Sequence, residues 1–317
     1  MRELGVDVFY SVKTNPERVI LSELHSLRTS FSVSDPEEFL LAIAVGAKPE
    51  DVLYYERGLT KERARWLSAS GCRNFAVDSR AAFENLLTEA AKGSAILIRI
   101  KAEGGSGKYS GGFVPGVDLK GAEELFEQCK KAGFKAGFLH HSSSQMEDEK
   151  SWEEKFNLLS KLPEADIVDI GGGMPIAYGD EDYSGVLKTI SKGIKKIKAK
   201  KVIIEPGRFI VGPACSLVAK VELIDRENAV LNCSVYNVHI DTIIADLILP
   251  CRALVSTGPI KAYRLLGSSL CNLDVFDHNA KLPAIGPGDF VVFDNAGAYN
   301  FSSDFGSGSG ITTYIVD

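Results

Sequence analysis

Short apolar runs rich in β-branched and aromatic residues alternate with longer amphipathic stretches along the first two thirds of the chain. Eight of these runs have the length of a strand. They cover residues 8–13, 31–34, 52–56, 74–78, 95–100, 135–141, 166–173 and 201–207. The pattern therefore predicts eight strands with helices between them.

The intervening segments carry the apolar spacing of helices. Asp35-Pro36 is typical of a helix start, because aspartate caps the first turn and proline fits the first helical position. The other predicted helices cover 60–69, 79–91, 119–132, 147–161 and 183–198. Eight strand-helix repeats over about 200 residues predict a (β/α)8 TIM-like barrel of the α/β class, although a doubly wound open sheet shows the same alternation.

Ionisable and glycine residues follow the predicted strands, and this distribution favours the barrel, whose chemistry lies at the C-terminal ends of its strands. We expect Asp35, Glu56 and Asp78 to act as helix caps or structural pairs. The residues at or just beyond the ends of the runs are Lys13, Ser34-Asp35, Glu56, Asp78, Arg99, His141, the glycines 171–173, Glu205 and Arg208.

Lys13 ends an apolar strand near the expected barrel axis. A lysine in such a place must pair with a carboxylate or be partly desolvated, and desolvation lowers its pKa toward that of a nucleophilic amine. We therefore expect Lys13 to form a Schiff base.

The loops after the last two predicted strands contain GGG at 171–173 and EPGR at 205–208. Phosphate groups commonly bind at this part of a barrel, although a tight turn also explains a triple glycine. The guanidinium of Arg208 suits bidentate phosphate recognition. Together with Lys13, His141 and Glu205, these loops point to pyridoxal 5'-phosphate as the cofactor.

Beyond the barrel, the helical period gives way to short strands with turn residues between them, which predicts an all-β domain. We expect a cofactor-binding barrel over residues 1–210 and a smaller C-terminal β domain over 211–317. The predicted strands of this domain cover 216–224, 229–238, 253–260, 262–268, 289–296 and 312–317.

The composition, 45% hydrophobic and 25% charged residues, is that of an ordinary globular chain. A net charge of −6 argues against nucleic-acid and membrane partners and leaves a small-molecule substrate. Neither a spanning helix nor a signal peptide is evident, so we expect a cytoplasmic protein. The six cysteines lack metal-binding spacing, which predicts free thiols and no metal site.

Five separated segments resemble, in order, the motifs of the fold type III pyridoxal-phosphate decarboxylases, the family of ornithine, arginine and diaminopimelate decarboxylases. The resemblance runs nearly from end to end, although the chain begins close to the Schiff-base strand and so suggests a compact or truncated form. The segments are FYSVKTNP (9–16), GFLHHSSSQ (137–145), DIGGGMP (169–175), IEPGRFIV (204–211) and GDFVVFDNAGAYNFSSDF (288–305).

The resemblance implies a role for each matching residue. Lys13 is the Schiff-base lysine, His141 stacks on the pyridine ring, Glu205 holds the pyridinium nitrogen, and Arg99 lies near the cofactor. The implied phosphate contacts come from Ser144, Gly172, Gly173, Gly207, Arg208 and Tyr299.

The resemblance also implies a homodimer with shared active sites, in which Cys271 of one subunit protonates the quinonoid formed in the other. The segment GSSLCNLDVF (267–276) departs from the family pattern, with Asn272 in place of an acid and one residue fewer before Asp274. The distal amine contact is left open between Asp241 and Asp246. The tentative substrate-binding residues are Tyr236, Asp246, Asn272 and Asp274.

The implied activity is decarboxylation of a basic amino acid such as ornithine, lysine or arginine, as in polyamine biosynthesis, or of meso-diaminopimelate. Asn272 leaves room for a carboxylated amine conjugate. An amino-acid racemase is a weaker alternative, because the related racemases place an arginine where Glu205 stands. The other alternative is a catalytically silent, cofactor-binding homologue that acts through protein association.

Overall fold

The structure is a computed structural model that describes residues 5–101, 113–254, 257–299 and 312–316. The chain divides into two compact units. The first contains Met1–Pro175 and Asp182–Gly207, and the second contains Ile176–Glu181 and Arg208–Asp317.

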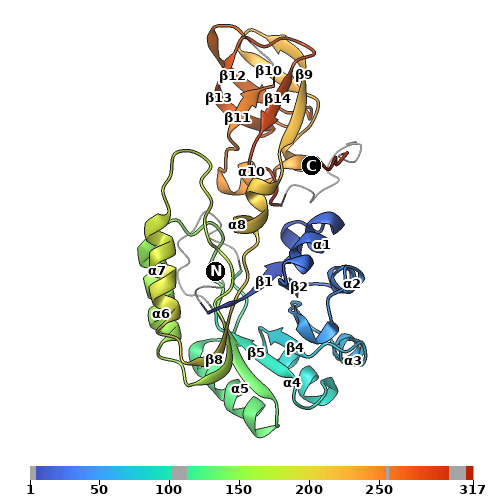
Figure 1. Ribbon diagram of the computed structural model, residues 1–317, viewed down its shortest axis with the longest axis vertical. Helices are drawn as coiled ribbons and strands as arrows, with labels where there is room; N and C mark the ends of the chain where they lie inside the picture. Colours follow the sequence, from blue (N-terminus) through green and yellow to red (C-terminus); the bar gives the residue numbers. More distant parts are fainter. Residues whose placement is uncertain (1–4, 102–112, 255–256, 300–311, 317) are drawn as a thin grey trace. The chain divides into compact units, whose positions relative to one another are not determined.

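The first unit is a closed barrel of eight parallel strands (Figure 1). Each strand pairs with the next along the chain, and β1 pairs with β8 through Asp7 with Ile203 and Val8 with Ile204. The predicted barrel is confirmed, and each of the eight predicted runs contains one strand. The strands are β1 (Asp7–Ser11), β2 (Ser30–Val33), β3 (Val52–Tyr54), β4 (Asn74–Val77), β5 (Ala95–Arg99), β6 (Lys135–Leu139), β7 (Ala165–Asp169) and β8 (Ala199–Ile204).

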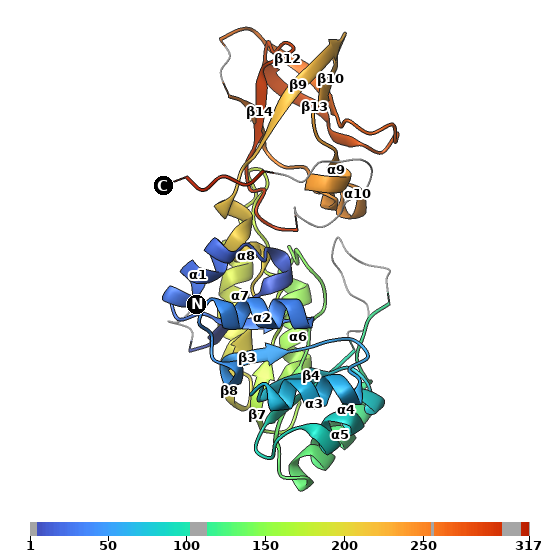
Figure 2. The same ribbon diagram turned by 90° about the vertical axis from the view of Figure 1, so that its right-hand side faces the viewer.

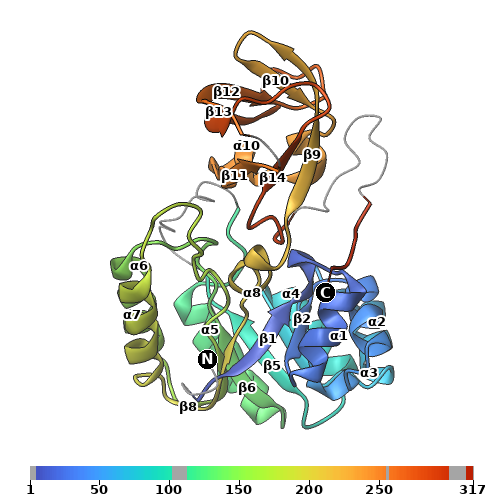
Figure 3. The same cartoon turned by 45° about the horizontal axis from the view of Figure 1, so that its top comes forward.

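Seven helices surround these strands in the described part of the first unit (Figure 3). Several begin at a side chain that caps the first turn. Asp35, for example, accepts a hydrogen bond from the Glu38 backbone N–H at 2.8 Å, with Pro36 at the first helical position, as predicted. The helices are α1 (Arg18–Ser26), α2 (Pro36–Ala44), α3 (Lys61–Ala69), α4 (Arg80–Glu89), α5 (Leu119–Lys131), α6 (Glu149–Leu159) and α7 (Ser184–Ile194).

Apolar side chains fill the interior of the barrel. Successive residues of a strand point to opposite faces, so one residue in two faces inward. The buried interior cluster consists of Phe9, Leu53, Ala76, Ala95, Leu97, Leu139, Ile167 and Ile203. Because the inward direction repeats every second residue, a residue two positions after a member of this cluster also faces the barrel axis.

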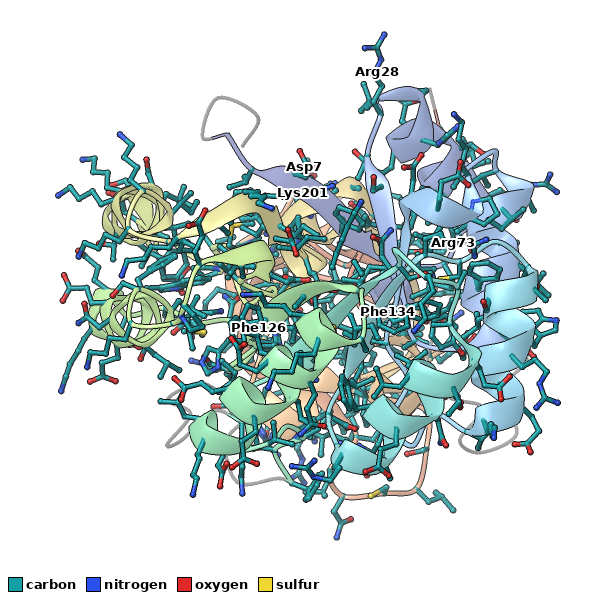
Figure 4. The ribbon with its side chains drawn as sticks, turned by 90° about the horizontal axis from the view of Figure 1, so that it is seen from below. Asp7, Arg28, Arg73, Phe126, Phe134 and Lys201 are labelled. Carbon is teal, nitrogen blue, oxygen red and sulfur yellow. The ribbon has the colours of Figure 1, made fainter. Side chains whose placement is uncertain are left out.

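The lysine-rich stretch 192–201 lies partly in α7 and partly in β8. Lys201 pairs with Asp7 of β1, with 2.7 Å between Nζ and Oδ2, across the seam that closes the barrel (Figure 4). Lys200 pairs with Asp166 of β7 at 2.8 Å. Lys200 and Lys201 therefore form ion pairs between neighbouring strands.

The second unit is a six-stranded sheet in the order β11-β14-β9-β10-β12-β13, with short helices (Figure 2). A second domain built on β strands was predicted and is confirmed, although the expected all-β character is not strict, because the unit also contains short helices. Its strands are β9 (Leu217–Asp225), β10 (Asn228–Leu231), β11 (Cys251–Ala253), β12 (Ile260–Leu266), β13 (Val275–Pro283) and β14 (Phe290–Phe293), and its helices are α8 (Arg208–Val211), α9 (Val235–Val238) and α10 (Asp241–Ala245). The described residues also contain three 3₁₀ turns, namely η2 (Val12–Thr14), η3 (Pro49–Asp51) and η4 (Gly212–Ala214).

Four details of the sequence prediction for this unit are wrong. Among its described residues, the predicted strand 253–260 is in a strand only at Ala253, the end of β11, and at Ile260, the start of β12. The run 229–238 is a strand only as far as Leu231, because the Ser234 side chain caps α9 and turns the chain into a helix. The strand β13 was not predicted, and residues 312–316 of the predicted last strand are not in a strand. Among the described residues, no helix has the length and apolar character needed to cross a membrane.

Helices α6 and α7 pack side by side, and the buried Gly193 of α7 allows their close approach (Figure 1). A Cβ atom at Gly193 would overlap the ring of Phe156, which is buried on α6. Phe156 has no room to move, so the helices would have to separate.

Gly193→Ala is expected to lower the free energy of unfolding by about 1–3 kcal/mol through this overlap. Gly185→Ala in the same helix is the matched control, since its Cβ would meet only the flexible carboxylate of Glu149. The control gains the helix propensity of alanine, about 0.5–1 kcal/mol. Urea unfolding measures both variants, and equal effects at the two positions would contradict this account of the helix pair.

Candidate functional site

The next inward-facing position after the apolar cluster, toward the C-terminal end of the strands, is occupied by a layer of polar side chains. Because every second residue faces inward, each polar residue stands two positions after a member of the cluster. The layer contains Tyr55, Asp78, Arg99, His141, Asp169 and Glu205. The fold thus brings Arg99, His141 and Glu205, three predicted site residues, to one end of the barrel.

Arg99 lies between aromatic and acidic neighbours from β3 and β4. Its guanidinium carbon is 5.1 Å from the centre of the Tyr55 ring, and the Tyr55 hydroxyl donates a hydrogen bond to Asp78 at 3.1 Å. Asp78 does not cap α4, which has Ser79 as its cap, but its hydrogen bond with Tyr55 is a structural pair of the kind expected. The two other expected structural roles are confirmed, since Asp35 caps α2 and Glu56 accepts a hydrogen bond from the Tyr54 hydroxyl at 2.7 Å.

His141 follows β6 and is held as a neutral ring. The backbone N–H of Gly172 donates to its Nδ1 at 3.3 Å, which requires an unprotonated Nδ1. Burial lowers the pKa of His141 well below its ordinary value, and the positive charges of Lys155, Arg99 and Lys13 lower it further. A neutral imidazole is therefore present near neutral pH.

The glycines after β7 are explained largely by protein atoms. A Cβ on Gly172 would lie 2.5 Å from the Glu205 carbonyl oxygen, and one on Gly173 would overlap the Ser143 carbonyl oxygen. Gly171 and Gly173 also have positive φ angles, of 66° and 98°, which favour glycine. The backbone N–H of Glu205 donates to the Gly171 carbonyl at 2.9 Å, so these contacts bind the β7 loop to the loops after β6 and β8.

Asp169, the last residue of β7, is a site residue that sequence reasoning missed. It is fully buried, and its Oδ1 accepts a hydrogen bond from the Gly171 N–H at 2.7 Å. Burial, and then the negative charge of Glu205, raise the pKa of Asp169 well above its ordinary value. Its place two residues after the inward Ile167 is the sequence signal that identifies it.

Lys13 lies just beyond β1 in the 3₁₀ turn Val12–Thr14. The side chain is exposed, so the expectation that it is paired or partly desolvated is wrong in this structure. Its charge nevertheless acts on His141 and on Glu38, whose pKa values it lowers. The next residue, Thr14, is buried, and its side chain would overlap any Cβ on Gly207.

Several buried polar atoms at this end of the barrel have no hydrogen-bond partner among the described residues. They are Thr14 Oγ1, Arg99 Nε and Asp169 Oδ2. Such atoms cost free energy unless water or a ligand satisfies them. With the amine of Lys13 nearby, they fit a polar ligand such as pyridoxal phosphate. Ser144, a predicted phosphate contact, lies half-buried in the loop after β6.

Arg208 and Tyr299, two predicted phosphate contacts, meet in the second unit. Arg208 is buried and donates hydrogen bonds to the Tyr178 hydroxyl at 2.7 Å and to Asp241 at 2.5 Å. The ring centre of Tyr299 is 5.0 Å from its guanidinium carbon. Asp241, one of two candidates for the substrate amine contact, is thus the buried partner of Arg208, whereas Asp246 is exposed.

Cys271 and Tyr236, both singled out from the sequence, form a pair. The Tyr236 hydroxyl and the Cys271 Sγ are 2.9 Å apart, and this hydrogen bond lowers the pKa of the thiol. The predicted substrate contact of Asp274 does not fit the structure. Asp274 is buried, and its carboxylate accepts hydrogen bonds from the backbone N–H groups of Val235 at 2.9 Å and Ser269 at 2.8 Å.

Comparison with known proteins identifies the family of this chain. The family described as "Pyridoxal-dependent decarboxylase, pyridoxal binding domain" matches residues 2–212. A diaminopimelate decarboxylase of Methanothermobacter thermautotrophicus is 26% identical over 93% of this chain and 76% of that protein. An ornithine decarboxylase of Schizosaccharomyces pombe is 24% identical, over 94% and 74%. Antizyme inhibitor 2 of Xenopus laevis is 23% identical, over 94% and 72%.

A solved structure supports the fold. The diaminopimelate decarboxylase of Helicobacter pylori, in complex with L-lysine, has a TM-score of 0.85 at 20% identity, covering 96% of this chain and 84% of that one. The family match spans the whole barrel. The chain therefore belongs to the pyridoxal-dependent decarboxylases and is an amino-acid decarboxylase that takes pyridoxal phosphate as its cofactor.

Proposed function

We propose that this protein decarboxylates an amino acid that carries a second amino group, either a basic amino acid or meso-diaminopimelate. The observation that carries the proposal is the inward polar layer at the C-terminal end of the barrel. It contains two carboxylates and a neutral histidine on which the charge of Lys13 acts. The relatives named as diaminopimelate and ornithine decarboxylases support this substrate class.

In this proposal Lys13 would hold the cofactor covalently through its side-chain amine. When bound, pyridoxal phosphate supplies a conjugated ring that accepts the electrons left on Cα as carbon dioxide departs. Glu205 would pair with the protonated ring nitrogen, and His141 would hold the ring. A neutral His141 suits this position, because a charged imidazolium would oppose the ring's positive charge.

Glu205 also favours decarboxylation over racemisation. A carboxylate beside the ring nitrogen keeps that nitrogen protonated and so strengthens electron withdrawal from Cα. An arginine in the same place, as in the racemases, would leave the nitrogen unprotonated. Asp169 adds a second inward carboxylate whose pKa Glu205 raises.

Cys271 is the proposed proton donor to Cα, and it would act in the active site of the partner subunit of a homodimer. The hydrogen bond from Tyr236 supports this role, because it lowers the pKa of the thiol and makes it a stronger acid. Tyr236 thus acts through Cys271, and its contact with substrate is not required. Dimerisation is a part of the proposal that the oligomeric state in solution tests directly.

The loop that carries Cys271 bears on substrate choice. The carboxylate of Asp274 in this loop accepts backbone hydrogen bonds, whereas Asn272 and Leu273 are exposed. The described loop therefore presents an amide where the family pattern has an acid. This arrangement favours a distal group recognised by neutral hydrogen bonds, such as the amino acid end of meso-diaminopimelate, over a lone ammonium.

Lys13→Ala is expected to abolish covalent cofactor binding and to reduce decarboxylation at least about a thousandfold, because the only proposed attachment point is lost. Carbon dioxide release from ornithine, lysine, arginine and meso-diaminopimelate and borohydride fixation of the cofactor measure the two effects. Lys48→Ala, another exposed lysine, is the control. Fixation in the variant would disprove the assignment. A wild-type protein that binds the cofactor and releases no carbon dioxide would favour a silent role, as the name of the antizyme inhibitor relative suggests.

Tyr236→Phe is expected to raise the pKa of Cys271, since the thiolate loses its hydrogen-bond donor. The thiolate is the form that reacts with iodoacetamide, so the midpoint of the rate against pH should move upward. The rate left in Cys271→Ser is subtracted to remove the other cysteines. Tyr314→Phe, at an exposed tyrosine, is the matched control. An unchanged midpoint would show that the hydrogen bond does not tune the thiol.

Asn272→Asp is expected to raise kcat/KM for ornithine and lysine relative to meso-diaminopimelate by about tenfold, because a new carboxylate attracts a lone distal ammonium. Steady-state kinetics on the three substrates measures the ratio. Asn279→Asp on β13, also at an exposed asparagine, adds the same charge away from Cys271 and should leave the ratio unchanged. Equal changes in both variants would mean that position 272 does not select the substrate.

A further inference from the structure

A lysine lies on the buried face of helix α6. The residues Trp152, Lys155, Phe156 and Leu159 form this face, with the spacing of a helix stripe that packs on a core. Lys155 is only 3% exposed, although lysine side chains almost always carry their ammonium group to water. Helix α6 therefore buries a lysine that has no role in the proposed reaction as described above.

Lys155 has little direct compensation. Its Nζ is 4.7 Å from the centre of the Trp152 ring and has no hydrogen-bond partner among the described residues. The indole itself is fixed, since its Nε1 donates to the Met146 carbonyl at 3.0 Å in the loop after β6. A cation–π contact of this kind offsets only part of the cost of burying an ammonium group.

The charges that act on Lys155 come from the strands that carry the site. Asp169 of β7 and Glu205 after β8 stabilise the ammonium, and Arg99 of β5 opposes it. Burial, the largest influence, lowers the pKa of Lys155 to about 7. Burial lowers the pKa values of His140 and His141, which follow β6, that of His140 to about 3, and the charge of Lys155 lowers both further. Both histidines therefore stay neutral, and the carboxylates are the counter-charges.

Asp169 needs a counter-charge in the same way. Its carboxylate is fully buried next to Glu205, and its Oδ2 has no hydrogen-bond partner among the described residues. The positive charges that act on it are those of Lys155 and Arg99. Two carboxylates in such surroundings tend to share a proton unless a cation stabilises both charges.

We propose that Lys155 is a positioning residue of the cofactor site, whose buried ammonium compensates the Asp169 carboxylate and so leaves Glu205 ionised to pair with the cofactor's ring nitrogen. The part that concerns Glu205 rests on the proposed function. The pairing of Lys155 with Asp169 does not depend on it.

The proposal predicts opposite pH dependences for the two single variants. In Lys155→Met, Asp169 remains buried with a pKa raised above its unfolded value, so the folded state loses stability as the pH rises through that pKa. In Asp169→Asn, Lys155 remains buried with a pKa lowered below its unfolded value, so the folded state loses stability as the pH falls through it. Removing both groups removes both dependences.

Thermal midpoints of the full chain, saturated with pyridoxal phosphate, test this from about pH 5 to about pH 9, a window that brackets the pKa of Lys155. Relative to wild type, Lys155→Met should lose several degrees more at the alkaline end, and Asp169→Asn several degrees more at the acidic end. The double variant should follow the wild-type pH profile. Lys150→Met, on the exposed face of the same helix, is the control and should change nothing.

A loss in Lys155→Met that is independent of pH and persists in the double variant would overturn the proposal, because it would assign Lys155 a packing role only. If Lys155→Met does not fold, a folded double variant supports the pairing and an unfolded one overturns it. The dissociation constant of the cofactor should rise about tenfold in Lys155→Met and recover in the double variant. These readouts do not require turnover, so failure of the proposed reaction and failure of the pairing are distinguishable.

Discussion

The pairing of β1 with β8 is the constraint on which the site depends. The register of Val8 with Ile204 sets Lys13 and Glu205, which lie near opposite ends of the barrel sequence, just beyond adjacent strands. The other strands follow in an unbroken parallel order, so their inward residues reach the same end of the barrel. A carboxylate, an imidazole and an amine can act on one ligand only because this closure brings their strands together.

Closure also creates an electrostatic problem. The inward layer holds Asp169 and Glu205 in surroundings that favour neutral groups, and Asp169 responds with a raised pKa. Arg99 and Lys155 bring the opposite charge from β5 and α6. The cofactor would add a negatively charged phosphate and a positively charged ring nitrogen to these four side chains. The balance of cations and carboxylates in the barrel therefore influences how favourable it is to bury the charged cofactor.

Much of the barrel was predictable because strand alternation is a local property of sequence. Lys13, Arg99, His141 and Glu205 could be identified without knowledge of the register, because they stand at or near the ends of the apolar runs. Asp169 was missed because a residue inside an apolar run shows its inward direction only when the neighbouring strands are placed. Lys155 was missed for a different reason, since a lysine on an amphipathic helix is ordinarily solvated and only burial of its face reveals it.

The second unit shows where residue type alone misleads. Asp241 and Asp274 are both acids near predicted site residues, and the carboxylates of both accept hydrogen bonds from other parts of the protein. Asp241 pairs with the buried Arg208, and Asp274 holds the backbone of the loop that carries Cys271. An acid serves recognition only when its oxygens remain free, which a sequence does not state. A substitution at Asp274 would remove the hydrogen bonds that hold this loop. A substitution at the exposed Asn272 can change the charge that a substrate meets without removing them.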